Sequence, residues 1–387
     1  MSAKSVALTP DLGYRVGLDA MSPAISAHEP LLELFRRHGS IRVDTPILQP
    51  ASLFLELSGE NIRRRLFVTQ DGEGGEFCLR PEHTIPVCVE HVRSGRVAGE
   101  YCYLGPVFRQ RSGEASEFAQ AGIESIGRED PVAADAEVFA VAIEALSLYS
   151  GRDYEVTVGD MGLLDALLTA LSVDAATRRR LVRQLASGQA ADTALAEEPR
   201  HPASDYAGLL AAIEGQDPRA AKAFVEDVIS IAGISAVGGR SAAEIAERFL
   251  SRASNRSGGI GAKARAVLQS YLSIRGDLGS AARAIREVAS NAGLDLAPAI
   301  GRFEARTGEM ERRGVALDRV RFAADSVRNM DYYTGFTFEV HDRAQPPGRF
   351  VIAGGRYDTL LEQLGAGRPS LAVGCSFWLD RLAGAGA

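Results

Sequence analysis

The feature that most constrains the fold is an Ala-, Leu-, Arg- and Glu-rich stretch from about residue 162 to residue 313. Apolar residues recur there with a period of 3.6, for example in 174–185 and 280–291, which is typical of amphipathic helices. On both sides of this stretch, apolar and polar residues alternate as in strands. We therefore predict one domain of helices and strands, formed by residues 1–160 and 317–387 and interrupted by an all-helical insertion at 161–316.

Composition narrows the class of protein. The 387 residues are 46% hydrophobic and 24% charged, with a net charge of −7, which excludes a disordered, collagen-like or disulfide-stapled chain. No apolar run approaches the roughly 20 residues that span a bilayer, and the N-terminus lacks an export signal. The four cysteines stand singly, as reduced thiols do, so we expect a cytoplasmic protein. No histidine spacing indicates a metal site.

Local sequence patterns predict the positions of several helices and strands. Ser26-Ala-His-Glu29 has the form of a capping box before a helix that Gly39 ends. The segment 41–46 alternates like a strand. The glycine-rich turn 71–75 lies between two strand-like segments and predicts a hairpin.

The first polar cluster is Leu79-Arg-Pro-Glu-His-Thr84. Because Pro81 ends the strand, Glu82 and Thr84 can project at a sheet end as an acceptor and a hydroxyl. The alternative is a helix-entry turn in which Thr84 only caps the helix.

The second cluster joins Arg109, at the end of one strand, to Gln120 and Glu124 on the next. Gln120 and Glu124 are four residues apart in a strand and so share one face. Arg109 near that face could bind a ligand carboxylate. A cross-strand ion pair is the equally simple alternative.

The third and fourth clusters are Arg328-Asn-Met-Asp-Tyr-Tyr-Thr-Gly335 and Ala353-Gly-Gly-Arg-Tyr-Asp358. Tyr332 and Tyr333 precede a strand, so they are expected to point in opposite directions, one of them into a pocket, unless both lie in the core. No phosphate-binding loop, dinucleotide fingerprint or nucleophile elbow is present, which argues against the common nucleotide-binding and hydrolase classes.

In this order, the clusters resemble the catalytic core of class II aminoacyl-tRNA synthetases, and of histidyl-tRNA synthetase in particular. Residues 36–46 resemble the dimer-forming motif 1, 105–127 motif 2 and 372–382 motif 3, while 328–333 and 354–358 resemble segments peculiar to the histidine enzyme. The resemblance implies an antiparallel sheet flanked by helices and a dimer formed through motif 1.

Two residues depart from the family pattern at positions where the synthetases bind ATP. Arg111 stands where motif 2 of the family has the Glu that holds adenine, and Trp378 stands where motif 3 has a Gly. The motif 2 loop 110–117 is also short and contains two glutamates, and the chain stops where the family continues into an anticodon-binding domain. We therefore expect loss of aminoacylation, no tRNA partner and no such domain.

The resemblance implies that the amino-acid pocket is retained. Its expected histidine-binding residues are Glu82, Thr84, Arg109, Gln120, Glu124, Arg328, Tyr332, Tyr333 and Tyr357. A retained histidine pocket beside a damaged ATP pocket resembles the regulatory subunits of ATP phosphoribosyltransferase, which are paralogues of the synthetase.

That family implies a non-catalytic subunit without a cofactor or metal. It would activate a short-form catalytic subunit, mediate feedback inhibition by histidine in the first step of histidine biosynthesis, and form a homodimer within a larger hetero-oligomer. The alternative is a histidyl-tRNA synthetase core that lacks its anticodon-binding domain.

Overall fold

A computed structural model describes residues 28–57, 62–149, 153–195, 260–327, 332–346 and 348–382. The chain divides into two compact units, one formed by residues 1–167 and 270–387 and the other by 168–269. The second unit is shorter than the insertion expected at 161–316. The difference arises because the helices α14 (Leu278–Ala292) and α15 (Ala297–Arg312) pack against elements of the first unit, β9 and α6 respectively.

The first unit is built on a sheet that has nine strands within the described residues, in the order β1-β5-β6-β12-β11-β10-β7-β9-β8. Only β1–β5 and β7–β9 pair in parallel among them, which agrees with the expected antiparallel sheet. The strand bounds are β1 Ile41–Arg42, β5 Gly99–Phe108, β6 Glu117–Ile126, β7 Tyr154–Asp160, β8 Arg275–Gly276, β9 Val320–Ala323, β10 Phe336–Asp342, β11 Phe350–Arg356 and β12 Ala372–Trp378.

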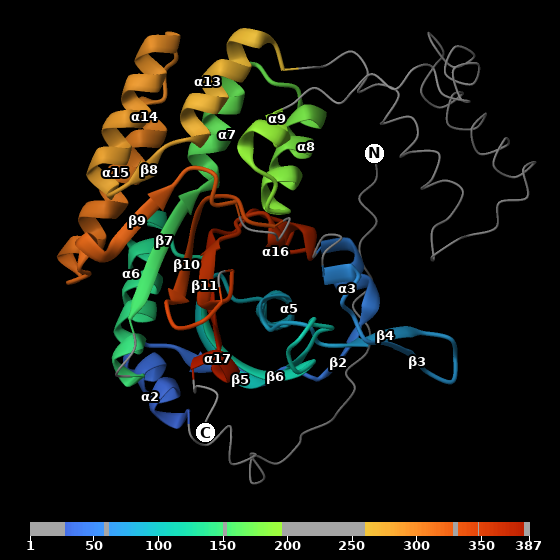
Figure 1. Cartoon of the computed structure of the whole chain (residues 1–387). Coiled ribbons are helices and arrows are strands. Elements are labelled where there is room, and N and C mark those ends of the chain that lie inside the picture. Colours follow the sequence, from blue (N-terminus) through green and yellow to red (C-terminus); the bar gives the residue numbers. More distant parts are fainter. Residues whose placement is uncertain are drawn as a thin grey trace, which may run out of the picture. The chain divides into compact units, whose positions relative to one another are not determined.

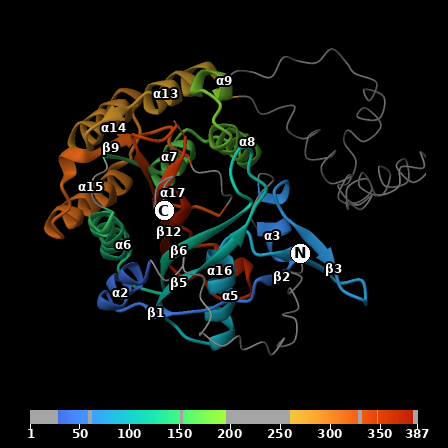
Figure 2. The same ribbon diagram turned by 60° about the horizontal axis from the view of Figure 1, so that its bottom comes forward.

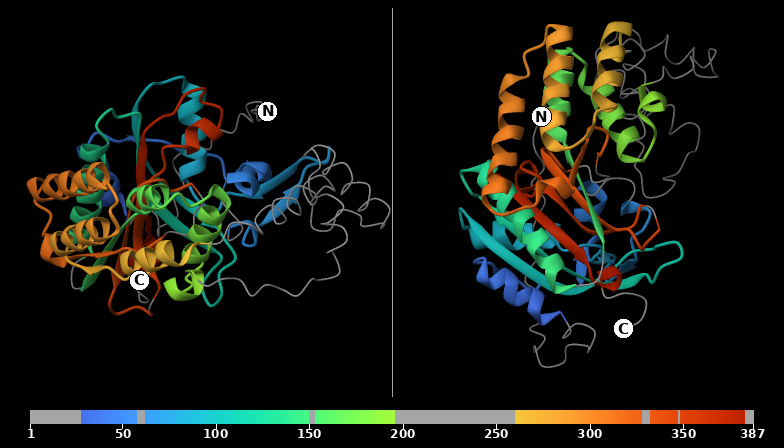
Figure 3. Two further views of the ribbon diagram at one scale, coloured as in Figure 1. Left: turned by 90° about the horizontal axis from the view of Figure 1, so that it is seen from above. Right: turned by 60° about the vertical axis from the view of Figure 1, so that its left-hand side comes forward.

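Helices cover both faces of this sheet (Figures 1 and 2). On one face, α2 (Glu29–Arg37) packs on β5 and β6, and α6 (Pro131–Ala145) packs on β6, β11 and β12. Figure 3 shows α14 and α15 side by side near the β9 end of the sheet. On the other face lie α5 (Thr84–Ser94) and α16 (Leu360–Gln363), whose apolar residues share a core with Tyr101 and Tyr103 of β5.

A smaller sheet, β2-β4-β3, contains the predicted hairpin. Its strands are β2 Leu48–Pro50, β3 Val68–Gln70 and β4 Glu76–Leu79, and α3 (Ala51–Leu57) follows β2. Asp71 stabilises the turn, because its carboxylate accepts hydrogen bonds from the backbone N–H groups of Glu73 and Gly75 at 3.0 and 2.7 Å.

Several element boundaries differ from the sequence-based prediction. The helix α2 begins at Glu29 after the N-cap residue His28, whose side chain makes no capping hydrogen bond, and Ser26 of the expected capping box lies outside the described residues. The strand expected at 41–46 is only the two-residue β1. Local alternation predicts strand character but not the point where a partner strand ends.

The second unit is helical in its described part. The helix α8 (Ala175–Ala186) begins after Asp174, whose carboxylate accepts from the N–H groups of Ala176 and Thr177, and α9 (Ala191–Leu195) follows it. The helices α7 (Met161–Ala170) and α13 (Ala262–Leu272) lead into and out of this unit, and α17 (Leu379–Leu382) follows β12. Within the described ranges, no helix is both long and apolar enough to cross a membrane.

Candidate functional site

The register of β5, β6 and β12 brings polar side chains onto the sheet face that α5 covers. Tyr103 pairs with Gly122 and Gly122 with Ser376, while Glu124 pairs with Gly374. Directly paired residues of antiparallel strands lie on the same face. Glu124 is therefore flanked on the β12 side by a residue without a side chain, and its carboxylate occupies the space that such a side chain would take.

Glu124 is the centre of a buried hydrogen-bond cluster. Its carboxylate accepts from the Thr84 hydroxyl at 2.7 Å, from the Tyr357 hydroxyl and, at 3.4 Å, from the Tyr103 hydroxyl. Burial raises the pKa of Glu124 to about 8, although the hydrogen bonds from Tyr357 and Thr84 act in the opposite direction. Two of the other residues expected in a histidine pocket, Thr84 and Tyr357, are thus in direct contact with Glu124.

Residue 374 must be a glycine because the Glu124 carboxylate occupies the space beside it. A Cβ atom added at Gly374 would overlap the Glu124 carboxylate. We expect Gly374→Ala to lower the free energy of unfolding by about 1–3 kcal/mol, as overpacking of a tight site does. Thermal unfolding measures this. The matched control is Gly301→Ala in α15, where an added Cβ meets nothing within 4 Å and a small gain in stability is expected. An equal response of the two variants would contradict the prediction.

Glu82 stabilises the start of α5. Its carboxylate accepts from the backbone N–H groups of Thr84 at 2.7 Å and Ile85 at 2.9 Å. The helix-entry turn considered in the sequence analysis is therefore present, but Glu82 binds its amides and Thr84 donates to Glu124 instead. Burial raises the pKa of Glu82, while these backbone hydrogen bonds and the nearby charge of Arg109 lower it.

Arg109 and Gln120 are buried without polar partners among the described residues. Gln120 has no exposed surface, yet neither its amide nitrogen nor its amide oxygen has a hydrogen-bond partner, and Arg109 Nε also lacks one. The ion pairs of the described residues do not include Arg109, so the cross-strand ion pair considered earlier is absent there. Burial lowers the pKa of Arg109 to about 10, and the charge of Glu82 partly offsets this.

Such groups indicate a missing polar partner. An unsatisfied buried polar group costs about 1–3 kcal/mol, and native structures contain few of them. A guanidinium and an amide left unpaired next to a buried carboxylate cluster are the donors and acceptors that a zwitterionic ligand would satisfy.

The tyrosines Tyr332, Tyr333 and Tyr357 come together at one side of this cluster. The ring centroids of Tyr332 and Tyr333 lie 5.0 Å apart, and those of Tyr332 and Tyr357 lie 5.8 Å apart in an edge-on arrangement. The expectation that Tyr332 and Tyr333 point in opposite directions is wrong, because both precede β10 and strand alternation does not apply to them. Arg328 lies outside the described residues.

Arg111 and its neighbours fill the adjacent region. Arg111 donates to Asp380 at 2.8 Å and to the Ala115 carbonyl, and its guanidinium lies 3.6 Å from the centroid of the Phe118 ring. Trp378 is 5% exposed and packs edge-on against Phe350, with ring centroids 4.6 Å apart. The two departures noted in the sequence are therefore both engaged in contacts within the protein.

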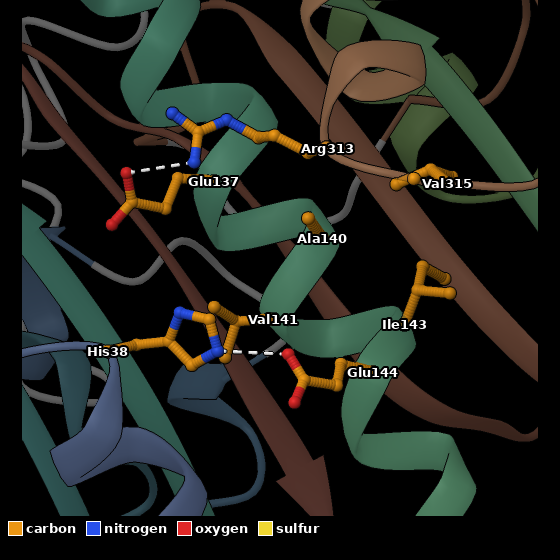
Figure 4. A pocket seen from close by; sticks show the side chains of 9 residues that line it. His38, Glu137, Ala140, Val141, Ile143, Glu144, Arg313 and Val315 are labelled. Carbon is orange, nitrogen blue, oxygen red and sulfur yellow. Dashed lines mark hydrogen bonds and ion pairs between the residues drawn. The ribbon is translucent and has the colours of Figure 1, made fainter.

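A hollow of about 400 Å³ lies elsewhere, between α2, α6 and the segment after α15 (Figure 4). Its charged groups are already paired: His38 lies 2.9 Å from Glu144, and Arg313 lies 3.2 Å from Glu137. None of the predicted site residues lines it. The Glu124 cluster, together with the unpaired groups of Arg109 and Gln120, therefore defines the better candidate site.

Sequence reasoning missed Tyr103, Ser376 and Gly374. The Tyr103 hydroxyl lies 2.7 Å from Ser376 Oγ and reaches Glu124. Strand alternation could have placed Tyr103 on the face of Glu124, but the register with β12, more than 240 residues away in the chain, carries no local signal. No group of three or more potential metal-ligating side chains occurs in the part of the chain that the structure describes.

Comparisons with known proteins agree with this fold. A family model described as "Histidyl-tRNA synthetase" matches residues 20–237 and 242–382. The fold is similar to a crystal structure of an ATP phosphoribosyltransferase regulatory subunit/histidyl-tRNA synthetase from Bacillus halodurans (TM-score 0.66, 21% identity, 97% of this chain and 83% of that one). It is also similar to histidyl-tRNA synthetase from Nostoc sp. (TM-score 0.61, 15% identity, 95% of this chain and 75% of that one).

The fold is thus that of a histidyl-tRNA synthetase-like, class II aminoacyl-tRNA synthetase domain. Closer sequence relatives are ATP phosphoribosyltransferase regulatory subunits. That of Mesorhizobium japonicum is 41% identical over 93% of this chain and 96% of its own length, and that of a Chelativorans species is 38% identical over 91% and 95%. The chain belongs to the family of ATP phosphoribosyltransferase regulatory subunits.

Proposed function

We propose that this chain binds histidine at the Glu124 cluster and transmits its presence to a short-form catalytic subunit of ATP phosphoribosyltransferase, which it also activates. The observation that supports this most directly is the pair of buried, unpaired groups on Arg109 and Gln120, on the same sheet face as Glu124, with Arg109 near Glu82. The partner enzyme is inferred from the names of the relatives, and the chemistry of the ligand is inferred from the site residues.

The ligand's three polar groups match the groups present. A guanidinium such as Arg109 can donate to the α-carboxylate, and the Gln120 amide can accept from the α-ammonium group. Glu124, held by Thr84 and Tyr357, can accept from an imidazole N–H. The aromatic rings of Tyr332 and Tyr333 can pack against the planar imidazole ring of the ligand. Arg328 belongs to the proposed site by resemblance alone.

Loss of aminoacylation is part of the proposal. Trp378, Phe350 and Phe118 pack where the synthetase resemblance puts the nucleotide, and Arg111 is a donor where adenine needs an acceptor. A catalytic synthetase core without an anticodon-binding domain is the alternative, and it requires ATP binding at these residues.

Regulation requires that histidine bind the active and the inhibited assemblies with different affinities. A coupling free energy of about 1–3 kcal/mol is sufficient for ordinary feedback. We place the homodimer contact at residues 36–46, where Ile41 of the edge strand β1 is 55% exposed, and propose no contact with tRNA. The four cysteines are buried free thiols, which supports the proposed cytoplasmic location.

The binding prediction uses Trp378, the only tryptophan of the chain. Arg109 lies 5.7 Å from its ring centroid, so a ligand that pairs with Arg109 is expected to change its fluorescence. We expect a saturable change with histidine and a much weaker response to histidinol, which lacks the carboxylate. Absence of any histidine response, by fluorescence and by calorimetry, would refute the proposed ligand.

The regulatory prediction needs the partner. Catalytic activity of the short-form subunit is expected to rise when this chain is added and to fall again as histidine is titrated in. ATP–pyrophosphate exchange by this chain with histidine is expected to be undetectable. Measurable exchange would instead favour the synthetase alternative.

A further inference from the structure

Thr334 connects the two tyrosine-bearing segments of the candidate site. It directly follows Tyr333 in the chain, while Tyr357 lies between Arg356 and Asp358. The Thr334 hydroxyl accepts a hydrogen bond from the Asp358 N–H at 3.0 Å and donates to the Arg356 carbonyl at 3.4 Å. The Thr334 N–H donates to the same carbonyl at 2.8 Å. Thr334 therefore bonds the backbone immediately before and immediately after Tyr357.

The segment around Tyr357 is also anchored on its other side. Arg356 donates to Asp135 of α6 at 2.9 Å and to Asp358 at 2.7 Å. Ala372, the first residue of β12, donates its N–H to the Asp358 carboxylate at 2.9 Å and accepts from the Tyr357 N–H at 2.8 Å. Thr334 thus joins the segment before β10 to a backbone that α6 and β12 already fix.

The contacts of the Tyr357 side chain make the position of this backbone important. Tyr357 is 1% exposed, its hydroxyl donates to Glu124, and its ring lies edge-on to that of Tyr332. Hydrogen bonds weaken steeply with distance and angle, and binding sites need their side chains held to about 0.5 Å. A shift of the backbone at residues 356–358 would therefore move the Tyr357 hydroxyl relative to Glu124.

We propose that Thr334 is a positioning residue of the Glu124 site: its hydroxyl fixes the backbone on both sides of Tyr357, which keeps the Tyr357 hydroxyl on Glu124 and the neighbouring tyrosine rings beside the same ligand. Thr334 acts through Tyr357. The inference rests on the proposed function for one element, the identity of the ligand as histidine.

The test begins with calorimetric titration of histidine into the full-length wild type, Thr334→Val and Thr334→Ser. Valine keeps the shape of threonine but leaves the Asp358 N–H without its acceptor. We expect Thr334→Val to bind histidine about 5- to 30-fold more weakly and Thr334→Ser, which restores the hydroxyl, to bind nearly as the wild type does. The matched control is Thr307→Val in α15, where the hydroxyl bonds the Phe303 carbonyl of its own helix at 2.9 Å; its affinity should equal that of the wild type.

A double-mutant cycle separates positioning of Tyr357 from a general loss of structure. If Thr334 acts through Tyr357, adding Thr334→Val to Tyr357→Phe should weaken histidine binding little beyond Tyr357→Phe alone. Additive losses would overturn the proposal, as would an unchanged affinity of Thr334→Val or a loss in Thr334→Ser equal to that in Thr334→Val. If Thr334→Val does not fold, as judged by its thermal transition, Thr334→Ala takes its place in every comparison.

Hydrogen exchange without any ligand tests the positioning role independently of histidine. Amide exchange in peptides that cover residues 356–359 is expected to be faster in Thr334→Val than in the wild type and in Thr307→Val. Equal exchange in all three proteins would overturn the proposal. Absence of a histidine response in the wild type would instead refute the proposed function, and the exchange comparison would still support or overturn the role of Thr334.

Discussion

Glu124→Gln is expected to weaken histidine binding by about 30- to 5,000-fold while the protein remains folded. The substitution replaces the carboxyl at the centre of the Thr84 and Tyr357 hydrogen bonds by an amide that cannot ionise when the ligand binds, and loss of one partner of a buried charged hydrogen bond costs about 2–5 kcal/mol. Calorimetric titration with histidine measures the effect. The matched control is Glu100→Gln, because Glu100 is a half-buried carboxylate on the neighbouring strand that bonds Ser125. Unchanged affinity in Glu124→Gln would place the ligand elsewhere.

The pH dependence of the same site follows from the pKa of Glu124, which burial raises to about 8. Between the unfolded value near 4.5 and about 8, the folded protein binds this proton and the unfolded chain does not. The contribution of Glu124 to stability therefore falls as the pH rises through this window, and Glu124→Gln should lose that slope in thermal unfolding.

The affinity for histidine is expected to change with pH in the opposite direction. A cationic or N–H-donating ligand favours ionised Glu124, so histidine is expected to bind more tightly at pH 8 than at pH 7 and to release a proton. Calorimetry in two buffers of different ionisation enthalpy detects that proton, and Glu124→Gln should not release it.

The largest expected loss of stability comes from Asp135→Ala. Asp135 lies in α6 and accepts from Arg356 of β11 at 2.9 Å and from Arg306 of α15 at 3.3 Å, with only 3% of its side chain exposed. Removing it leaves two buried guanidinium groups short of an acceptor, which costs about 3–5 kcal/mol. We expect the melting temperature to fall by about 5–15 °C.

The control for Asp135→Ala is Glu137→Gln on the same helix. Glu137 pairs with Arg128 at 2.9 Å and Arg313 at 3.2 Å but is 26% exposed, and such pairs contribute about 1 kcal/mol or less. Asp135→Asn, which keeps an acceptor oxygen, is expected to fall between the two. Similar melting temperatures for Asp135→Ala and Glu137→Gln would show that the buried network is not needed for stability.

Sequence reasoning predicted the strands of the site because their alternation is local. It placed Gln120 and Glu124 on one face correctly, and the hairpin around Asp71 is confirmed. The length of β1 and the directions of Tyr332 and Tyr333 could not be read in this way. They depend on where pairing with another strand begins, and no local periodicity encodes that.

Sequence reasoning could not identify the ion-pair partners of individual charged residues either. Arg356 lies in a segment that the sequence singled out, but its acceptor Asp135 is 221 residues away in sequence. The one available signal was a carboxylate, Asp135, that stands between two alanines, Ala134 and Ala136, on the apolar side of α6. Buried charges are rare unless paired, so that position indicated an ion pair without identifying its partner.

The position of β12 has a consequence for synthesis of the chain. It follows all other described strands of this sheet in the chain, yet it lies between β6 and β11 in the middle of the sheet. Until residues 372–378 are made, β6 and β11 each lack a neighbour, and Glu124 lacks the Gly374 surface beside it. Long-range pairings of this kind form slowly, and unpaired strand edges aggregate, so the nascent chain is expected to need protection until β12 inserts.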